Sequence, residues 1–209
     1  MYRILCFGDS ITYGTWDSSH IGWSGRLREQ VEKDGDRNRL FNLGISGETT
    51  TQLLKRIKNE CEARVDTRKP YKYIITIATG TNDAKGRPNP LTEEELKNKI
   101  KIYKKELKKC IKIAQQFTTE VYVIGLTPVD ETKTSPGQFT SGPAYFSNKA
   151  GNEFNQAAKS VAMNMNTKFI DVREAFEKQN FIKLLADGLH PNSKGYDLMY
   201  EVIRKELNL

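Results

Sequence analysis

The sequence predicts a three-layer α/β/α fold in which helices cover both faces of a five-stranded parallel sheet. Five short, largely apolar runs are typical of strands buried on both faces, and they alternate with longer segments of helical periodicity. Such alternation is typical of parallel β-α-β units. The chain has 209 residues without a repeat or a linker, so we expect a single domain over residues 1–209.

The predicted strands span residues 2–7, 40–45, 71–78, 121–126 and 168–172. The third strand is the clearest, because its sequence YKYIITIA is rich in β-branched and aromatic residues. Thr92 and Glu95 form a capping box before a long amphipathic segment. Helices are expected over residues 23–31, 49–61, 93–116, 144–165 and 193–207. Residues 127–143, rich in Gly, Ser, Thr and Pro, indicate a surface loop, with 134–142 as a candidate lid.

Composition excludes several classes of protein. Hydrophobic residues make up 37% of the chain, and no apolar run approaches the roughly 18 residues that cross a bilayer. Residues 2–7 are too short for the apolar region of a signal peptide, so we expect a cytoplasmic protein. The net charge of +7 owes much to lysines on one face of a predicted helix, within residues 97–112. No nucleic-acid-binding motif accompanies them, so we expect no nucleic-acid partner.

The cysteines and histidines indicate neither a disulfide framework nor a metal site. Cys6, Cys61 and Cys110 are odd in number and lack CxxC spacing, which favours reduced thiols. His20 and His190 belong to no Cys/His cluster, so no metal site is expected.

Glycines and small polar residues gather after four of the predicted strands. Ser10 follows the first strand in Gly-Asp-Ser-Ile, Gly47 follows the second in Ser-Gly-Glu-Thr, and Asn82 follows the third in Gly-Thr-Asn-Asp. The segment after the fifth strand ends in Asp187-Gly-Leu-His190. In open α/β sheets ligands bind outside the carboxyl ends of the strands, so we expect these residues to converge there.

Ser10 fits two roles. A serine between a strand and a helix commonly caps the helix, and this reading needs no chemistry. The serine is a nucleophile if a base and an orienting acid lie beside it. His190 is the candidate base, and Asp187, three residues earlier, is placed to fix the tautomer of the imidazole.

Three groups are candidate donors to an oxyanion: the backbone N–H groups of Ser10 and Gly47, and the side-chain amide of Asn82. Each has an ordinary alternative, since glycine suits tight turns and asparagine suits Asx-turns. Asp9 and Asp83 are expected to shape these loops rather than to react.

Together these segments resemble the SGNH hydrolases, also called the GDSL esterase/lipase family. Gly8-Asp9-Ser10-Ile11 is similar to the first block of that family, with Ile in place of Leu, and the other three segments are similar to its second, third and fifth blocks. The resemblance implies a flavodoxin-like five-stranded sheet and a Ser-His-Asp triad that cleaves esters through an acyl-serine intermediate. It also implies oxyanion donors at Ser10, Gly47 and Asn82, and no metal or organic cofactor. No G-x-S-x-G elbow is present, which disfavours an α/β-hydrolase.

The substrate is less defined by the sequence than the chemistry. Four side chains are candidates for substrate binding: Trp16, His20, Tyr145 and Phe146. Trp23 is another aromatic residue near Ser10, but it fits a place in the hydrophobic core at least as well. The lack of a lipid-interface helix favours small soluble esters or acetylated carbohydrates. Two alternatives stay open: acyl transfer to an acceptor other than water, and a catalytically silent flavodoxin-like binding module. Flavin binding lacks support, because no phosphate-cradling loop rich in Ser and Thr follows the first strand.

Overall fold

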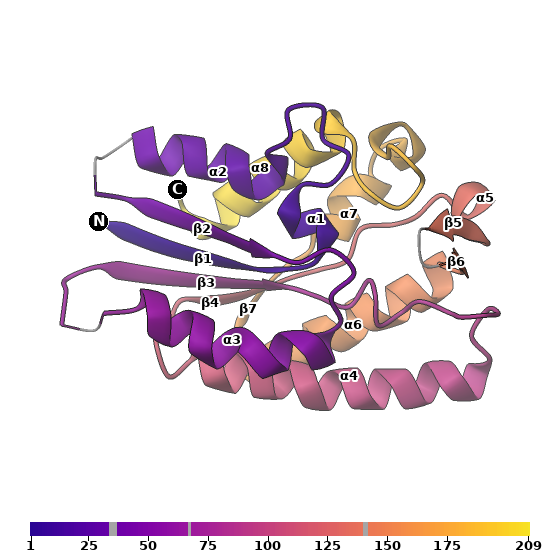
Figure 1. Cartoon of the computed structure of the whole chain (residues 1–209), viewed down its shortest axis with the longest axis horizontal. Helices are drawn as coiled ribbons and strands as arrows, with labels where there is room; N and C mark the ends of the chain where they lie inside the picture. Colours follow the sequence, from indigo (N-terminus) through magenta and orange to yellow (C-terminus); the bar gives the residue numbers. More distant parts are fainter. Residues whose placement is uncertain (34–36, 67, 140–141) are drawn as a thin grey trace.

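A five-stranded parallel sheet lies at the centre of the molecule (Figure 1). The computed structural model describes residues 1–33, 37–66, 68–139 and 142–209. The strands follow the order β2-β1-β3-β4-β7, and all neighbours pair in parallel. Their bounds are Tyr2–Gly8 (β1), Arg39–Gly44 (β2), Lys72–Ala78 (β3), Val121–Ile124 (β4) and Lys168–Ile170 (β7). The predicted flavodoxin-like sheet is confirmed.

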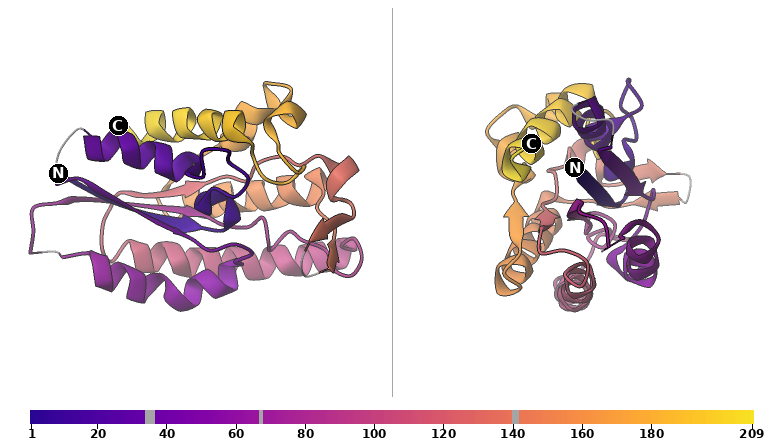
Figure 2. Two further views of the ribbon diagram at one scale, coloured as in Figure 1. Left: turned by 45° about the horizontal axis from the view of Figure 1, so that its top comes forward. Right: turned by 90° about the vertical axis from the view of Figure 1, so that its left-hand side faces the viewer.

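Helices cover both faces of this sheet, which confirms the three layers (Figure 2). Their bounds are Gly22–Lys33 (α2), Thr50–Arg64 (α3), Glu93–Ala114 (α4), Asn148–Asn164 (α6) and Ser193–Leu207 (α8). Successive strand residues point to opposite faces, so β1 contributes to two cores. Leu5 and Phe7 pack in the core under α3, α4 and α6, whereas Ile4 and Cys6 pack in the core under α2 and α8.

The long helix α4 follows from its sequence. Thr92 caps it by accepting the N–H of Glu95 at 3.2 Å, and the Glu95 carboxylate accepts the N–H of Thr92 at 2.8 Å. Three glutamates in its first turn stabilise the helix, because their negative charges lie at the positive end of the helix dipole. Tyr103 and Leu107, four residues apart, are buried against the sheet. The capping box and the buried face were both predictable from the residue pattern.

Residues 127–143 do not form the single surface loop predicted for them. They contain the short helix α5 (Glu131–Thr134), the strand β5 (Gly137–Phe139) and the start of the strand β6 (Gly142–Ala144), which pairs with β5. Residues 140 and 141 of the candidate lid lie outside the described residues. The helix predicted over 144–165 begins at Asn148, because Ala144 belongs to β6 and Ser147 caps the helix by accepting the N–H of Ala150.

Three further elements lack a counterpart in the sequence prediction. They are α1 (Ser10–Tyr13), α7 (Val172–Glu177) and a single 3₁₀ turn, η1 (Phe181–Leu184). Each is too short to show helical periodicity in a sequence. Among the helices that the structure describes, none combines the length and the apolar character needed to cross a membrane.

Candidate active site

A cavity of about 610 Å³ opens at the carboxyl ends of the strands. The chain leaves β1 for β2 on one side and later returns to β3 on the other side, so β1 and β3 flank the topological switch point. Ser10 follows β1 and Asn82 follows β3, and both line the cavity. Gly47, Asp187 and His190 line it as well, so the structure brings together all five residues predicted to converge.

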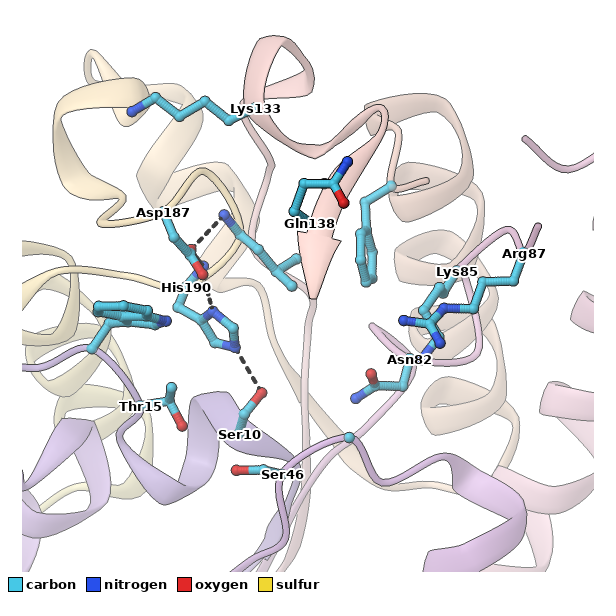
Figure 3. Close-up of a pocket in the computed structure, with 15 residues that line it drawn as sticks. Ser10, Thr15, Ser46, Asn82, Lys85, Arg87, Lys133, Gln138, Asp187 and His190 are labelled. Atoms are coloured by element: carbon cyan, nitrogen blue, oxygen red, sulfur yellow. Dashed lines mark hydrogen bonds and ion pairs between the residues drawn. The ribbon is translucent and has the colours of Figure 1, made fainter. Parts of the chain in front are cut away.

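Ser10, His190 and Asp187 are hydrogen-bonded in series (Figure 3). The Ser10 Oγ lies 2.9 Å from the His190 Nε2, and the His190 Nδ1 lies 2.7 Å from the Asp187 Oδ2. A carboxylate accepts only, so the ring donates from Nδ1 to Asp187 and its Nε2 is left to accept the Ser10 hydroxyl proton. This is the tautomer that a general base requires.

The loop before α8 fixes the Asp187 carboxylate in place. The Asp187 Oδ1 accepts the backbone N–H groups of Leu189 and His190 at 2.9 and 2.8 Å. Burial disfavours the charged carboxylate, but the His190 side chain and these N–H groups outweigh it and hold the pKa of Asp187 below its ordinary value. Asp187 is therefore ionised at neutral pH and keeps the imidazole oriented.

A tight turn after β1 presents Ser10 to the cavity. Asp9, not Ser10, is the N-cap of α1, because the Asp9 Oδ1 accepts the N–H of Ile11 at 3.0 Å. The capping role considered for Ser10 is thus filled by its neighbour. The turn depends on Gly8, since a Cβ at that position would clash with the Thr12 side chain and lie 2.6 Å from the Ala78 carbonyl oxygen.

Two of the predicted oxyanion donors are held in loops beside Ser10. The Asn82 amide points toward Ser10, and its Nδ2 lies 3.3 Å from the Asp9 Oδ2 and 3.2 Å from the Glu48 carbonyl oxygen (Figure 3). Gly47 has a φ of +80°, a conformation that glycine adopts without strain. Both hydrogen bonds of Asn82 are at the long end of the usual range.

Asp9 and Asp83 hold the loops and do not line this cavity. Asp9 is 3% exposed, and burial raises its pKa to about 6. Asp83 accepts the backbone N–H and the hydroxyl of Thr50, each at 3.0 Å, and so ties the loop after β3 to the start of α3. Burial raises the pKa of Asp83 as well.

Trp16 lies at the mouth of the cavity. Its side chain is 63% exposed, and its φ of +66° is uncommon for a residue other than glycine. The adjacent Asp17 anchors this loop: its carboxylate accepts the N–H of Gly22 at 2.9 Å, the Arg26 guanidinium at 2.6 Å and the Ser193 hydroxyl at 2.6 Å. The loop is thereby tied to both α2 and α8.

Of the other three candidates for substrate binding, the structure places only Phe146 in the lining of the cavity. Phe146 is buried and lines the cavity. His20 is exposed and Tyr145 pairs through its backbone with Gly86, and neither contributes to the lining. Trp23 is fully buried in α2, as the core alternative requires.

Several lining residues were not singled out from the sequence. They are Thr15, Ser46, Lys85, Arg87, Lys133, Gly137, Gln138 and Leu189. Lys85 and Arg87 lie a few residues after Asn82, so their place after a strand of the sheet was the available signal.

Metal-ligating side chains and cysteines are two further classes of reactive group in this chain. In the ranges that the structure describes, no three His, Cys, Asp or Glu side chains are grouped so as to hold a metal ion. Cys6, Cys61 and Cys110 are buried, and burial raises the pKa of each thiol to about 12. These cysteines are therefore not thiolates at neutral pH.

A model of the GDSL-like Lipase/Acylhydrolase family matches residues 6–198, which include all five converging residues. The chain belongs to this family. Among curated proteins, this GDSL-like protein is 26% identical to a human isoamyl acetate-hydrolyzing esterase 1 homolog, with 95% of the chain and 78% of the relative aligned. It is 24% identical to the uncharacterized protein YpmR of Bacillus subtilis, with 97% and 82% aligned.

Solved structures of similar proteins share the fold. A lipase/acylhydrolase from Enterococcus faecalis superposes with a TM-score of 0.75 at 23% identity, over 99% of this chain and 95% of that one. An acetylxylan esterase from Geobacillus stearothermophilus superposes with a TM-score of 0.71 at 19% identity, over 99% and 94%. These neighbours support the GDSL-like α/β fold.

Proposed function

We propose that this GDSL-like protein is a serine ester hydrolase in which Ser10, His190 and Asp187 form the catalytic triad. The observation that carries the proposal is the series of two hydrogen bonds, 2.9 and 2.7 Å long, from the Ser10 hydroxyl through His190 to Asp187. A serine in a cavity beside a correctly oriented imidazole is an activated nucleophile.

The reaction follows from this geometry. The Ser10 Oγ bonds to the ester carbonyl carbon while its proton passes to the His190 Nε2. Negative charge then develops on the carbonyl oxygen, where the N–H groups of Ser10 and Gly47 and the Asn82 amide donate to it. As the tetrahedral intermediate collapses, the alkoxide leaves with the proton from His190, and the acyl group stays on Ser10.

A water molecule completes the cycle. It attacks the acyl carbon, His190 takes its proton, and the Ser10 oxygen departs and regains a proton from His190. Throughout the cycle Asp187 holds the imidazole and stabilises its protonated form.

Small soluble esters are the substrates that the site favours. The cavity holds about 610 Å³, and Trp16 and Phe146 supply apolar surface in its lining. Two of the similar proteins are named for the hydrolysis of acetyl esters, isoamyl acetate in one and acetylxylan in the other. We therefore propose short acyl groups, including acetyl groups on carbohydrates.

Hydrolysis of p-nitrophenyl esters of increasing acyl length tests this function. Wild-type protein is expected to prefer the short esters, and Ser10→Ala is expected to lower kcat by about 10⁴-fold or more, the scale of triad knockouts. Turnover in Ser10→Ala at the wild-type rate would exclude Ser10 as the nucleophile. Product analysis with an added alcohol separates hydrolysis from acyl transfer, because transfer yields the new ester.

A further inference from the structure

The cavity that contains Ser10 is lined by an excess of positive charge. Three cationic side chains contribute to it: Lys85, Arg87 and Lys133. The one carboxylate among the described lining residues is that of Asp187, and its oxygens are already engaged with His190 and with backbone N–H groups. A cleft lined by charges of one sign concentrates ligands of the opposite sign.

Lys85 and Arg87 are held on the cavity wall by the backbone between them. Gly86 pairs with Tyr145 through two hydrogen bonds, 2.9 and 3.1 Å long. Residues on either side of an extended residue project to the same face, so the two cationic side chains lie together. Figure 3 shows both beyond Asn82, on the side of the cavity away from His190. The Arg87 Nη2 also donates to the Gly142 carbonyl oxygen at 3.0 Å.

The surroundings of Lys85 disfavour its positive charge. The side chain is partly buried, and no ion pair joins it to a carboxylate of the described chain. Burial and the charges of Arg87 and Lys99 lower the pKa of Lys85, and the more favourable effect of Asp83 does not outweigh them. A bound anion would offset both the burial and the repulsion.

We propose that this cavity selects esters that carry an anionic group, such as a carboxylate, bound by Lys85 and Arg87. The inference rests on the proposed esterase function and narrows its substrate class. Arg87 offers a planar fork that matches two oxygens of a carboxylate, and Lys85 adds a compact charge beside it. Lys133, from α5 on the other side of the opening, adds to the field that attracts the anion.

Two matched pairs of esters test the selection and show which part of the ester carries the anion. In the acyl pair, mono-(p-nitrophenyl) glutarate is compared with p-nitrophenyl valerate, whose acyl chain has the same number of carbons. In the alcohol pair, 4-acetoxybenzoate is compared with 4-acetoxybenzamide. The spontaneous rate of each ester, which for the glutarate includes attack by its own carboxylate, is subtracted first. Values of kcat/KM are then divided by the rate of each ester with hydroxide, which corrects for differences in reactivity toward an external nucleophile.

In at least one pair, the anionic ester is expected to exceed its neutral partner by about tenfold or more at low ionic strength, the effect of one good charge-assisted contact. Lys85→Gln and Arg87→Gln are each expected to reduce this preference, mainly through KM, and added salt is expected to erode it. Lys108→Gln removes the same charge from an exposed position on α4 and serves as the matched control, with the preference unchanged.

Three results overturn the selection: neutral esters favoured in both pairs, no difference in either pair, or a preference that survives in both cavity variants. Failure of the proposed function gives a different result, since Ser10→Ala would then cleave all four esters at the wild-type rate. If the protein cleaves neutral esters through Ser10 and shows no preference for charged ones, the proposed selection is refuted and the proposed esterase function stands.

Discussion

Replacing Asp9 with asparagine removes a buried negative charge beside the candidate nucleophile while nearly preserving the size of the side chain. Asp9 is 3% exposed, and its two carboxylate oxygens accept from Ile11 N–H and from the Asn82 amide. Asparagine keeps one acceptor for Ile11 but presents a second donor to Asn82. The variant therefore changes one hydrogen bond and one charge.

The charge has a pH-dependent cost that the structure defines. Burial raises the pKa of Asp9 from its ordinary 3.8 to about 6, so the folded state disfavours the ionised form. Above pH 6 the charge on Asp9 lowers the free energy of unfolding by about 3 kcal/mol, because each unit of the rise in its pKa corresponds to about 1.4 kcal/mol. As pH falls from 6 toward 4 the folded state takes up the proton first, so the penalty fades to about 1 kcal/mol at pH 4.5.

Urea unfolding of wild type and Asp9→Asn at pH 8 and pH 4.5 measures this effect. Relative to wild type, the variant is expected to be more stable at pH 8 than at pH 4.5 by about 2 kcal/mol. The changed hydrogen bond to Asn82 costs the same at both pH values, so it cancels from that difference. A relative stability equal at the two pH values would show that Asp9 is not desolvated as the structure indicates.

Asp17→Asn is the matched control, because Asp17 is equally buried but differently surrounded. Burial disfavours its charge, yet the hydrogen bonds from Arg26 and Ser193 outweigh this and hold its pKa well below the ordinary value. The stability that Asp17 contributes is lost only as pH falls below about 4. Asp17→Asn is expected to destabilise the protein equally at pH 8 and pH 4.5.

Three further substitutions test the site. Asn82→Ala is expected to lower kcat by roughly 10²–10³, the scale of one oxyanion donor, and a normal kcat would remove Asn82 from that role. Asp187→Asn is expected to lower kcat by about 10⁴-fold because the imidazole loses its orienting acceptor, and steady-state kinetics with near-wild-type kcat would contradict this. Gly8→Ala is expected to lower the free energy of unfolding by about 1–3 kcal/mol through overpacking against Thr12 and Ala78, and an unchanged urea midpoint would show that the turn relaxes.

The sheet and the convergence of the candidate site were predictable because both depend on strong, regular signals. Runs such as residues 2–7 and 71–78 are largely apolar, as is typical of strands buried on both faces. Parallel strands place their carboxyl ends at one edge, so Ser10, Asn82 and His190 meet even though they are distant in sequence.

The segment between β4 and α6 was not predictable, because contacts distant in sequence organise it. The N–H of Asp130 donates to the Gly188 carbonyl oxygen at 2.8 Å, and the N–H of Phe146 donates to the Thr134 carbonyl oxygen at 2.9 Å. Its composition of Gly, Ser, Thr and Pro indicates turns but not which partners they find.

The cationic residues of the cavity wall were hidden for a similar reason. Lys85 and Arg87 look in the sequence like ordinary solvated charges that happen to follow a strand, and the pairing of Gly86 with Tyr145 places them on the cavity wall. His20 stands close to Trp16 in the sequence, but it is exposed outside the cavity in a loop that Asp17 organises.

Covalent labelling by a fluorophosphonate tests the central claim most directly, because this reagent reacts with serines activated by a neighbouring base. Ser46 also lines the cavity but has no such base in the described structure, so Ser46→Ala is the control that should still be labelled. Intact-mass and peptide analysis of wild type is expected to show one adduct, on Ser10, and Ser10→Ala is expected to show none. An unlabelled wild type, or an adduct on another serine, would contradict the assignment of Ser10 as the nucleophile.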